Sequence, residues 1–138
     1  YKRQGLGHIG KAAEAVYLRP QNGGIGMPEG RDVFINACHY MVEALEKVTQ
    51  SYGKTVQDLN WISSHQANQR ILNAARTRLH LPKEKFPGNI AACGNTSSAC
   101  IPLLIDEMRK DGRLRDGQTI ALSAFGAGLT HGAVVLRL

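Results

Sequence analysis

Three short polar turns hold the residues whose types suit the chemistry of a carbonyl group. The first, "HQANQR", places His65 directly after an apolar run. The second, "GNTSS", carries Asn95 just before another apolar segment, and the third, "FGAG", has glycines at positions 126 and 128. A neutral imidazole, a carboxamide and closely approaching main-chain N–H groups can together stabilise an enolate or a tetrahedral oxyanion. The three turns therefore predict stabilisation of a carbonyl oxygen without a metal.

Each turn also has an ordinary structural interpretation. A lone histidine is more often structural than catalytic, so His65 is a candidate only together with Asn95 and the glycine turn. Thr96 or Ser97 could be a common N-cap, which would make Asn95 a tolerated turn residue. The glycines could belong to an ordinary hairpin. The residues alone leave these alternatives open.

Composition and motifs exclude several classes of function. The net charge is +6, but the basic residues are scattered and aromatics make up only 6%, so a solvated basic surface is favoured over nucleic-acid binding. No histidines and cysteines have metal-site spacing, which predicts no metal. No Walker sequence or G-x-G-x-x-G occurs, and "GAG" alone does not indicate a nucleotide loop.

The cellular setting follows from the same composition. No apolar run approaches the length of a membrane-spanning helix, and the first residues lack a signal-peptide core, so we expect no membrane partner. Three cysteines without a C-x-x-C pair predict free thiols in a reducing cytoplasm. The absence of a starting Met indicates that Tyr1 is not the natural beginning.

Apolar spacing predicts the elements that hold the three turns. The pattern is typical of an α/β layered domain, in which helices alternate with strands and a strand pair ends the chain. A stripe from Phe34 to Tyr52 predicts a helix that Gly53 ends. The other expected elements are strands over 13–19, 58–64, 118–125 and 129–138, a brief strand within 85–92, and helices over 68–80 and 96–110.

The stretches "HQANQRI", "GNTSSACIP" and "AFGAGLTHG", in this order, resemble the C-terminal half of β-ketoacyl-acyl-carrier-protein synthase III, within the thiolase-like superfamily. The resemblance covers residues 31–138, and residues 1–30 read as a partial connecting segment of strand and loop. It implies half of a layered α/β/α fold with a mixed five-stranded sheet. It also implies a decarboxylating Claisen condensation of acyl-CoA with malonyl-acyl-carrier protein, which starts fatty-acid synthesis, with no cofactor.

The resemblance assigns a role to each site residue. His65 and Asn95 would be catalytic and bind the malonyl thioester carbonyl. Phe125, Gly126 and Ala127 would form the gate and the oxyanion loop. The remaining assignments are a substrate tunnel at Asn68 and acyl-carrier-protein contacts at Gln66 and Arg70. A cytoplasmic homodimer is expected for the full-length protein.

The family's nucleophilic cysteine belongs to an N-terminal half that this sequence does not contain. Cys38 lies in an apolar helical stripe and Cys100 inside an expected helix, so both are interpreted as core. Cys93 is placed better for a nucleophile but matches a position that is not nucleophilic in the family, and packing is favoured there too. We therefore expect a fragment that is inactive alone and needs the N-terminal half as its partner.

Three rival functions stay open at this point. Type III polyketide synthases also pair a histidine with an asparagine, and "DEMR" resembles them, although "HQAN" favours synthase III. A synthase III relative in specialised metabolism is a second option. The third is a non-catalytic domain that binds coenzyme A or pantetheine.

Overall fold

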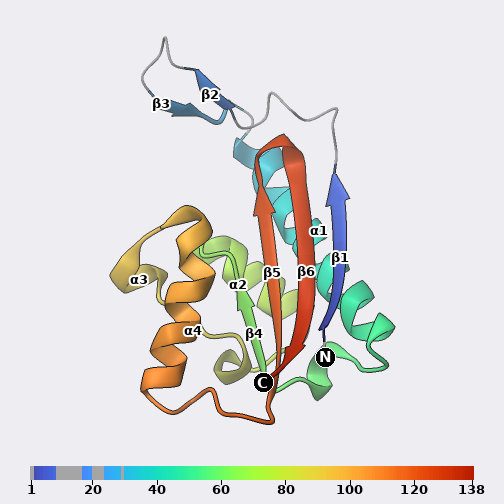
Figure 1. Cartoon of the computed structure of the whole chain (residues 1–138). Helices are drawn as coiled ribbons and strands as arrows, with labels where there is room; N and C mark the ends of the chain where they lie inside the picture. Colours follow the sequence, from blue (N-terminus) through green and yellow to red (C-terminus); the bar gives the residue numbers. More distant parts are fainter. Residues whose placement is uncertain (1, 9–16, 20–23, 29) are drawn as a thin grey trace.

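The computed structural model describes residues 2–8, 17–19, 24–28 and 30–138. Their centre is a mixed four-stranded sheet with the strand order β1-β6-β5-β4 (Figure 1). Its strands are β1 (Lys2–His8), β4 (Trp61–Ser64), β5 (Thr119–Gly126) and β6 (Thr130–Arg137). β4 runs parallel to β5, whereas β6 is antiparallel to both of its neighbours, β5 and β1. The α/β class and the mixed sheet are confirmed.

Among the described residues, this sheet has four strands and lacks the expected fifth. The expected strand over 85–92 is replaced at its start by the end of a 3-10 turn, Lys83–Lys85, and at its end by the short helix α3 (Ile90–Cys93). Pro87 has no N–H to give to a ladder, and the N–H of Asn89 donates to the side chain of Gln66 rather than to a neighbouring strand. The expectation of a strand here was therefore wrong.

The segment before residue 31 supplies more structure than a connection. β1 pairs with β6 along its whole length, so this segment contributes an edge strand to the main sheet. The strand expected over 13–19 survives as β2 (Tyr17–Arg19), which pairs only with β3 (Gly24–Gly26) in a separate ribbon. Residues 13–16 lie outside the described residues.

Helices α1 (Gly30–Ser51) and α2 (Gln69–Arg78) cover one face of the sheet (Figure 1). The predicted stripe of α1 is confirmed, since Ala37, Met41, Leu45 and Val48 are all buried. Its end is also confirmed, because Gly53 adopts the positive φ of 77° that favours glycine. These helices pack on the side chains of the sheet that alternate toward them, such as Ile62, Ala121, Ala133 and Val135.

Helix α4 (Cys100–Lys110) lies on the opposite face of the sheet (Figure 1). Its buried Leu104 and Met108 cluster with Leu114 and Ile120, and Trp61 packs against the same cluster. The helix begins four residues later than predicted, because Ser97–Ala99 forms a separate 3-10 turn. Pro102 consequently falls in the first turn of α4, where the missing N–H costs no hydrogen bond.

The predicted strand pair at the end of the chain is confirmed. β5 and β6 are joined by a 3-10 turn, Ala127–Leu129, in which Gly128 has a φ of 96°. Because β4 and β5 are parallel, their carboxyl ends meet at one edge of the sheet. His65 directly follows β4, and "FGAG" consists of the last two residues of β5 and the start of the next turn, which places both at this edge.

Candidate active site

His65 is the first residue after β4 and is held by that strand's neighbour. Its main-chain N–H donates to the Ser123 carbonyl at 2.8 Å and extends the strand pairing by one step. The half-buried imidazole has its Nδ1 2.9 Å from the Sγ of Cys100. Burial lowers the pKa of His65 below its ordinary value, and a hydrogen bond with the Ser97 main chain offsets part of this effect. The imidazole is therefore neutral at physiological pH.

Asn95 lies in the turn that leads to α4. Gly94 before it has a φ of 67°, a backbone conformation that side chains disfavour. The Oδ1 of Asn95 accepts a hydrogen bond from the Ser97 N–H at 2.9 Å, and neither Thr96 nor Ala99 caps the following helical turns with its side chain. Asn95 therefore organises this turn, and the group that it can offer to a ligand is its Nδ2 donor.

The "FGAG" turn combines one anchored residue with two accessible ones. Phe125 is buried and packs in a cluster with Met41, Ile71 and Leu129. Gly126 and Ala127 line the open space beside it. The Ala127 carbonyl accepts a hydrogen bond from the Thr130 hydroxyl at 3.1 Å, which fixes the orientation of the peptide group between Ala127 and Gly128.

A single cleft of about 1310 Å³ receives these three turns. It lies at the carboxyl ends of β4 and β5 and extends over sheet residues of β1 and β6, including Gln4 and Val134. Every predicted site residue except Gln66 lines it: His65, Asn68, Arg70, Asn95, Phe125, Gly126 and Ala127. In the part of the chain that the structure describes, no three His, Cys, Asp or Glu side chains gather into a candidate metal site.

Two residues at the start of α2 form part of the cleft wall. Asn68 is the N-cap of α2, and its Oδ1 accepts a hydrogen bond from the Arg70 N–H at 2.8 Å. Arg70 is exposed, and its guanidinium carbon lies 5.4 Å from the centroid of the Phe34 ring. Arg70 thus places a cation at the rim of the cleft, which Arg31 of α1 also lines.

Gln66 does not lie where the resemblance implied. Its side chain is completely buried, its Nε2 donates to the Ser64 carbonyl, and its Oε1 accepts from the Asn89 N–H. A side chain without exposed surface cannot contact a docked carrier protein, so the expectation was wrong for Gln66. A polar residue in a turn is usually expected to be exposed. The hydrogen-bond partner of Gln66, the Asn89 N–H, lies 23 residues further along the chain, so the sequence does not indicate the contact.

The three cysteines differ in their surroundings. Cys38 is buried in α1 as predicted, and burial raises the pKa of its thiol. Cys93 is exposed and does not line the cleft. Cys100 is buried, but its sulfur contacts both the His65 imidazole and the Gln66 N–H, at 2.9 and 3.3 Å. This contact was not predicted, because Cys100 was expected inside the helix, whereas it is the first residue of α4.

Comparison with known proteins agrees with this geometry. The family described as 3-oxoacyl-[acyl-carrier-protein (ACP)] synthase III C terminal matches residues 49–138, more than half of the chain. A β-ketoacyl-[acyl-carrier-protein] synthase III from Staphylococcus saprophyticus is 44% identical over 132 residues, which make up 96% of this chain and 42% of that protein. A chloroplastic enzyme of the same name from Arabidopsis thaliana is 44% identical over 108 residues, or 78% of this chain and 27% of that protein.

Solved structures give the same result. The synthase III crystal structure from Thermus thermophilus superposes with a TM-score of 0.93 at 38% identity, covering 99% of this chain and 45% of that one. The synthase III structure from Aquifex aeolicus gives a TM-score of 0.93 at 37% identity, covering 99% and 44%. The chain spans less than half the length of these relatives. On this evidence the chain belongs to the 3-oxoacyl-acyl-carrier-protein synthase III family and corresponds to its C-terminal region.

Proposed function

We propose that this chain is the C-terminal part of a β-ketoacyl-acyl-carrier-protein synthase III, an acyltransferase that condenses acyl-CoA with malonyl-acyl-carrier protein. In this proposal an N-terminal half supplies the cysteine that accepts the acyl group. The observation that carries the proposal is that His65, Asn95 and the Phe125–Ala127 turn, which are far apart in sequence, line one cleft. Family membership supports the same reaction.

The two catalytic side chains act in the decarboxylation step. The imidazole of His65 and the Nδ2 of Asn95 donate hydrogen bonds to the thioester oxygen of the malonyl group. When the carbon–carboxylate bond breaks, carbon dioxide leaves and its electron pair forms an enolate, whose negative charge grows on that oxygen. A neutral His65 suits this role, because an acidic side chain in its place would repel both malonate and enolate.

The enolate carbon then attacks the acyl thioester on the cysteine. The tetrahedral oxyanion formed there is stabilised by main-chain N–H groups, among which we assign that of Ala127. The intermediate collapses and expels the cysteine thiolate. Phe125, buried next to this turn, shapes the passage to the sulfur.

Replacement of His65 or Asn95 by Ala in the full-length protein tests the proposal. We expect each variant to lose malonyl decarboxylation by about 10²–10³-fold, the usual cost of one oxyanion donor. Transfer of the acyl group from acyl-CoA to the cysteine should be largely unchanged, because the cysteine performs that step. Radioactive carbon dioxide release and protein labelling measure the two steps separately. Asn73→Ala, on the exposed side of α2, is the control, and normal decarboxylation in both His65 and Asn95 variants would contradict the role assignment.

The acidic carrier protein is the proposed partner at the rim, and Arg70 is its proposed contact. Arg70→Glu should raise KM for malonyl-acyl-carrier protein by about tenfold or more at low salt, and less at high salt, because the interaction is electrostatic. KM for malonyl-CoA should change little. The matched control is Arg115→Glu, the same charge change in the loop between α4 and β5. An equal change of KM for both substrates would remove the docking role.

A further inference from the structure

The buried carboxamide of Gln66 joins the two segments that carry the catalytic pair. Gln66 directly follows His65, and its own main-chain N–H donates to the sulfur of Cys100. Its Nε2 donates to the Ser64 carbonyl at 2.8 Å, which closes the turn on the end of β4. Gln66 therefore bonds both to the end of β4, through its side chain, and to the first residue of α4, through its main chain.

The oxygen of the same carboxamide holds the other segment. Oε1 accepts the Asn89 N–H at 3.2 Å, and Asn89 begins the stretch that runs through α3 to Asn95. The fit is tight on this side, since a Cβ added to Gly88 would lie 2.8 Å from Oε1. Only glycine at position 88 lets the main chain come this close to the carboxamide.

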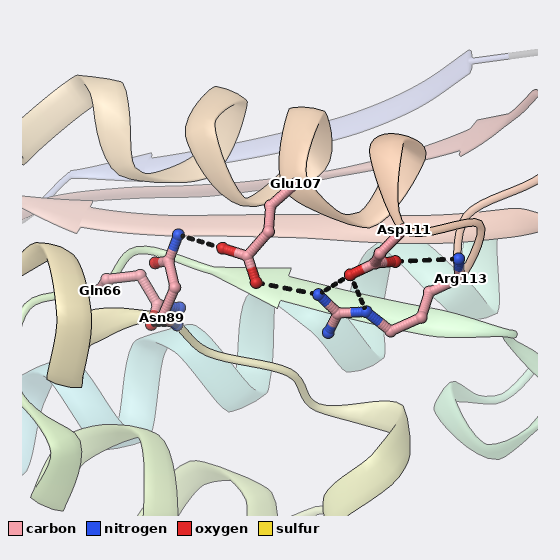
Figure 2. Close-up of polar contacts among 5 residues, drawn as sticks. All are labelled: Gln66, Asn89, Glu107, Asp111 and Arg113. Carbon is pink, nitrogen blue, oxygen red and sulfur yellow. Dashed lines mark hydrogen bonds and ion pairs between the residues drawn. The ribbon is translucent and has the colours of Figure 1, made fainter.

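A chain of polar contacts continues from Asn89 to the surface (Figure 2). The Nδ2 of Asn89 donates to Glu107 of α4 at 3.1 Å. The second carboxylate oxygen of Glu107 accepts from Arg113 at 2.9 Å, and Arg113 is also bound to Asp111. Helix α4, which begins at Cys100, is therefore tied to the same loop at its far end.

We propose that Gln66 is the positioning residue that sets the distance between His65 and Asn95, with Gly88, Asn89 and Glu107 supporting its carboxamide. The inference rests on the proposed function of His65 and Asn95 and adds the way in which their spacing is maintained. Two donors share one oxygen only when both are held within a few tenths of an ångström, and a displacement of about 1 Å can cost a hundredfold in rate.

Gln66→Met in the full-length protein is the first test. Methionine has a similar volume but forms neither amide hydrogen bond, so the turn and the Asn89 segment are no longer joined. We expect kcat for decarboxylation to fall by about ten- to a hundredfold, with KM for the malonyl substrate and the rate of cysteine acylation within about twofold. Gln69→Met is the matched control, because Gln69 is exposed and bonds only to Asn73 on its own helix.

Two further variants alter the surroundings of the Gln66 carboxamide without altering Gln66 itself. They decide the question if Gln66→Met does not fold. Gly88→Ala should displace the carboxamide and lower the same kcat by about tenfold. Glu107→Ala should produce a smaller loss of a few-fold, whereas Asp106→Ala, which removes a neighbouring acid bound only to Lys110, should produce none.

The outcomes separate this inference from the proposed function. Unchanged decarboxylation in Gln66→Met and Gly88→Ala, alongside its loss in His65→Ala, would overturn the positioning role and leave the proposed function intact. Equal losses of acylation and decarboxylation would overturn it too, because they indicate general loss of structure. Normal decarboxylation in both His65→Ala and Asn95→Ala would overturn the positioning role and the proposed function together.

Discussion

The two segments that carry the proposed catalytic pair, His65 and Asn95, are built in different ways. The turn after β4 is partly buried, with Gln66 completely enclosed, and His65 and Gln66 bond to β5, to α4 and to the Asn89 segment. The turn before α4 is exposed, and the bond of Asn95 to the Ser97 N–H is local. The protein thus holds the histidine through contacts of the core, whereas the direct contact of Asn95 is local and its segment reaches the core only earlier, at Asn89.

This difference predicts which changes affect both stability and catalysis and which affect catalysis alone. Changes near His65 affect buried hydrogen bonds and should alter both folding and catalysis. Changes at Asn95 affect an exposed group and should alter catalysis alone. Substitutions in and around the two turns test this division.

Asn95→Asp should be more damaging to catalysis than Asn95→Ala. The substitution keeps the size of the side chain and its acceptor for Ser97, but it replaces the Nδ2 donor by a negative charge that faces the developing enolate. We expect decarboxylation to fall by about 10³-fold or more, and by about tenfold more than in Asn95→Ala. Single-turnover release of carbon dioxide measures both variants, and an Asp variant at least as active as the Ala variant would break the assignment of Asn95 as a donor.

The free energy of unfolding should be affected more by a change beside the buried end of β4 than by a change at Asn95. The hydroxyls of Ser64 and Ser123 are buried and 2.7 Å apart, so Ser123→Ala leaves the Ser64 hydroxyl without its partner. We expect a loss of about 1–3 kcal/mol in the free energy of unfolding, against about 0.5 kcal/mol or less for Asn95→Ala. Denaturant midpoints of the full-length protein give the measurement, provided that the slope is unchanged.

The double variant completes this prediction. Removing both hydroxyls, in Ser64→Ala with Ser123→Ala, eliminates the unpaired group and should cost less than the sum of the single changes. Additive losses would indicate that the two hydroxyls do not depend on each other, and an equally large loss in Asn95→Ala would remove the contrast between the two turns.

The long periodic segments of the fold were predictable from the sequence. The stripe of α1, the strand that becomes β4 and the closing strand pair have enough apolar repeats to define one face each. The edge strand β1, "KRQGLGH", has no such alternation, and it forms because β6, from the other end of the chain, offers it a partner. Pairing between distant segments leaves no local pattern to read.

The polar turns that line the candidate site were predictable from the sequence, but the contacts that hold these turns in place were not. His65 and Asn95 stand out because polar residues interrupt apolar runs at the ends of regular elements. Gln66 and Cys100 also lie near these turns, but their contacts depend on how the Asn89 segment and α4 pack in three dimensions. The burial of Gln66 depends on the N–H of the distant Asn89, and no local pattern in the sequence indicates that contact.

The smallest expected effect is in the pH dependence of decarboxylation. Burial lowers the pKa of His65, so the neutral, donating imidazole should persist as the pH falls through about 6.5, the ordinary value for histidine. An unshifted histidine would lose half of the rate at that pH, whereas we expect a loss well below twofold there, with the steep decline at lower pH. His131 is another histidine that lines the cleft, and Arg70 is a cation that does so, which makes His131→Gln the necessary control. The acidic limb of the wild-type profile should lie below pH 6.5 and stay in place in His131→Gln; a limb at or above 6.5, or one that moves with His131, would show that the core around His65 does not keep its imidazole neutral.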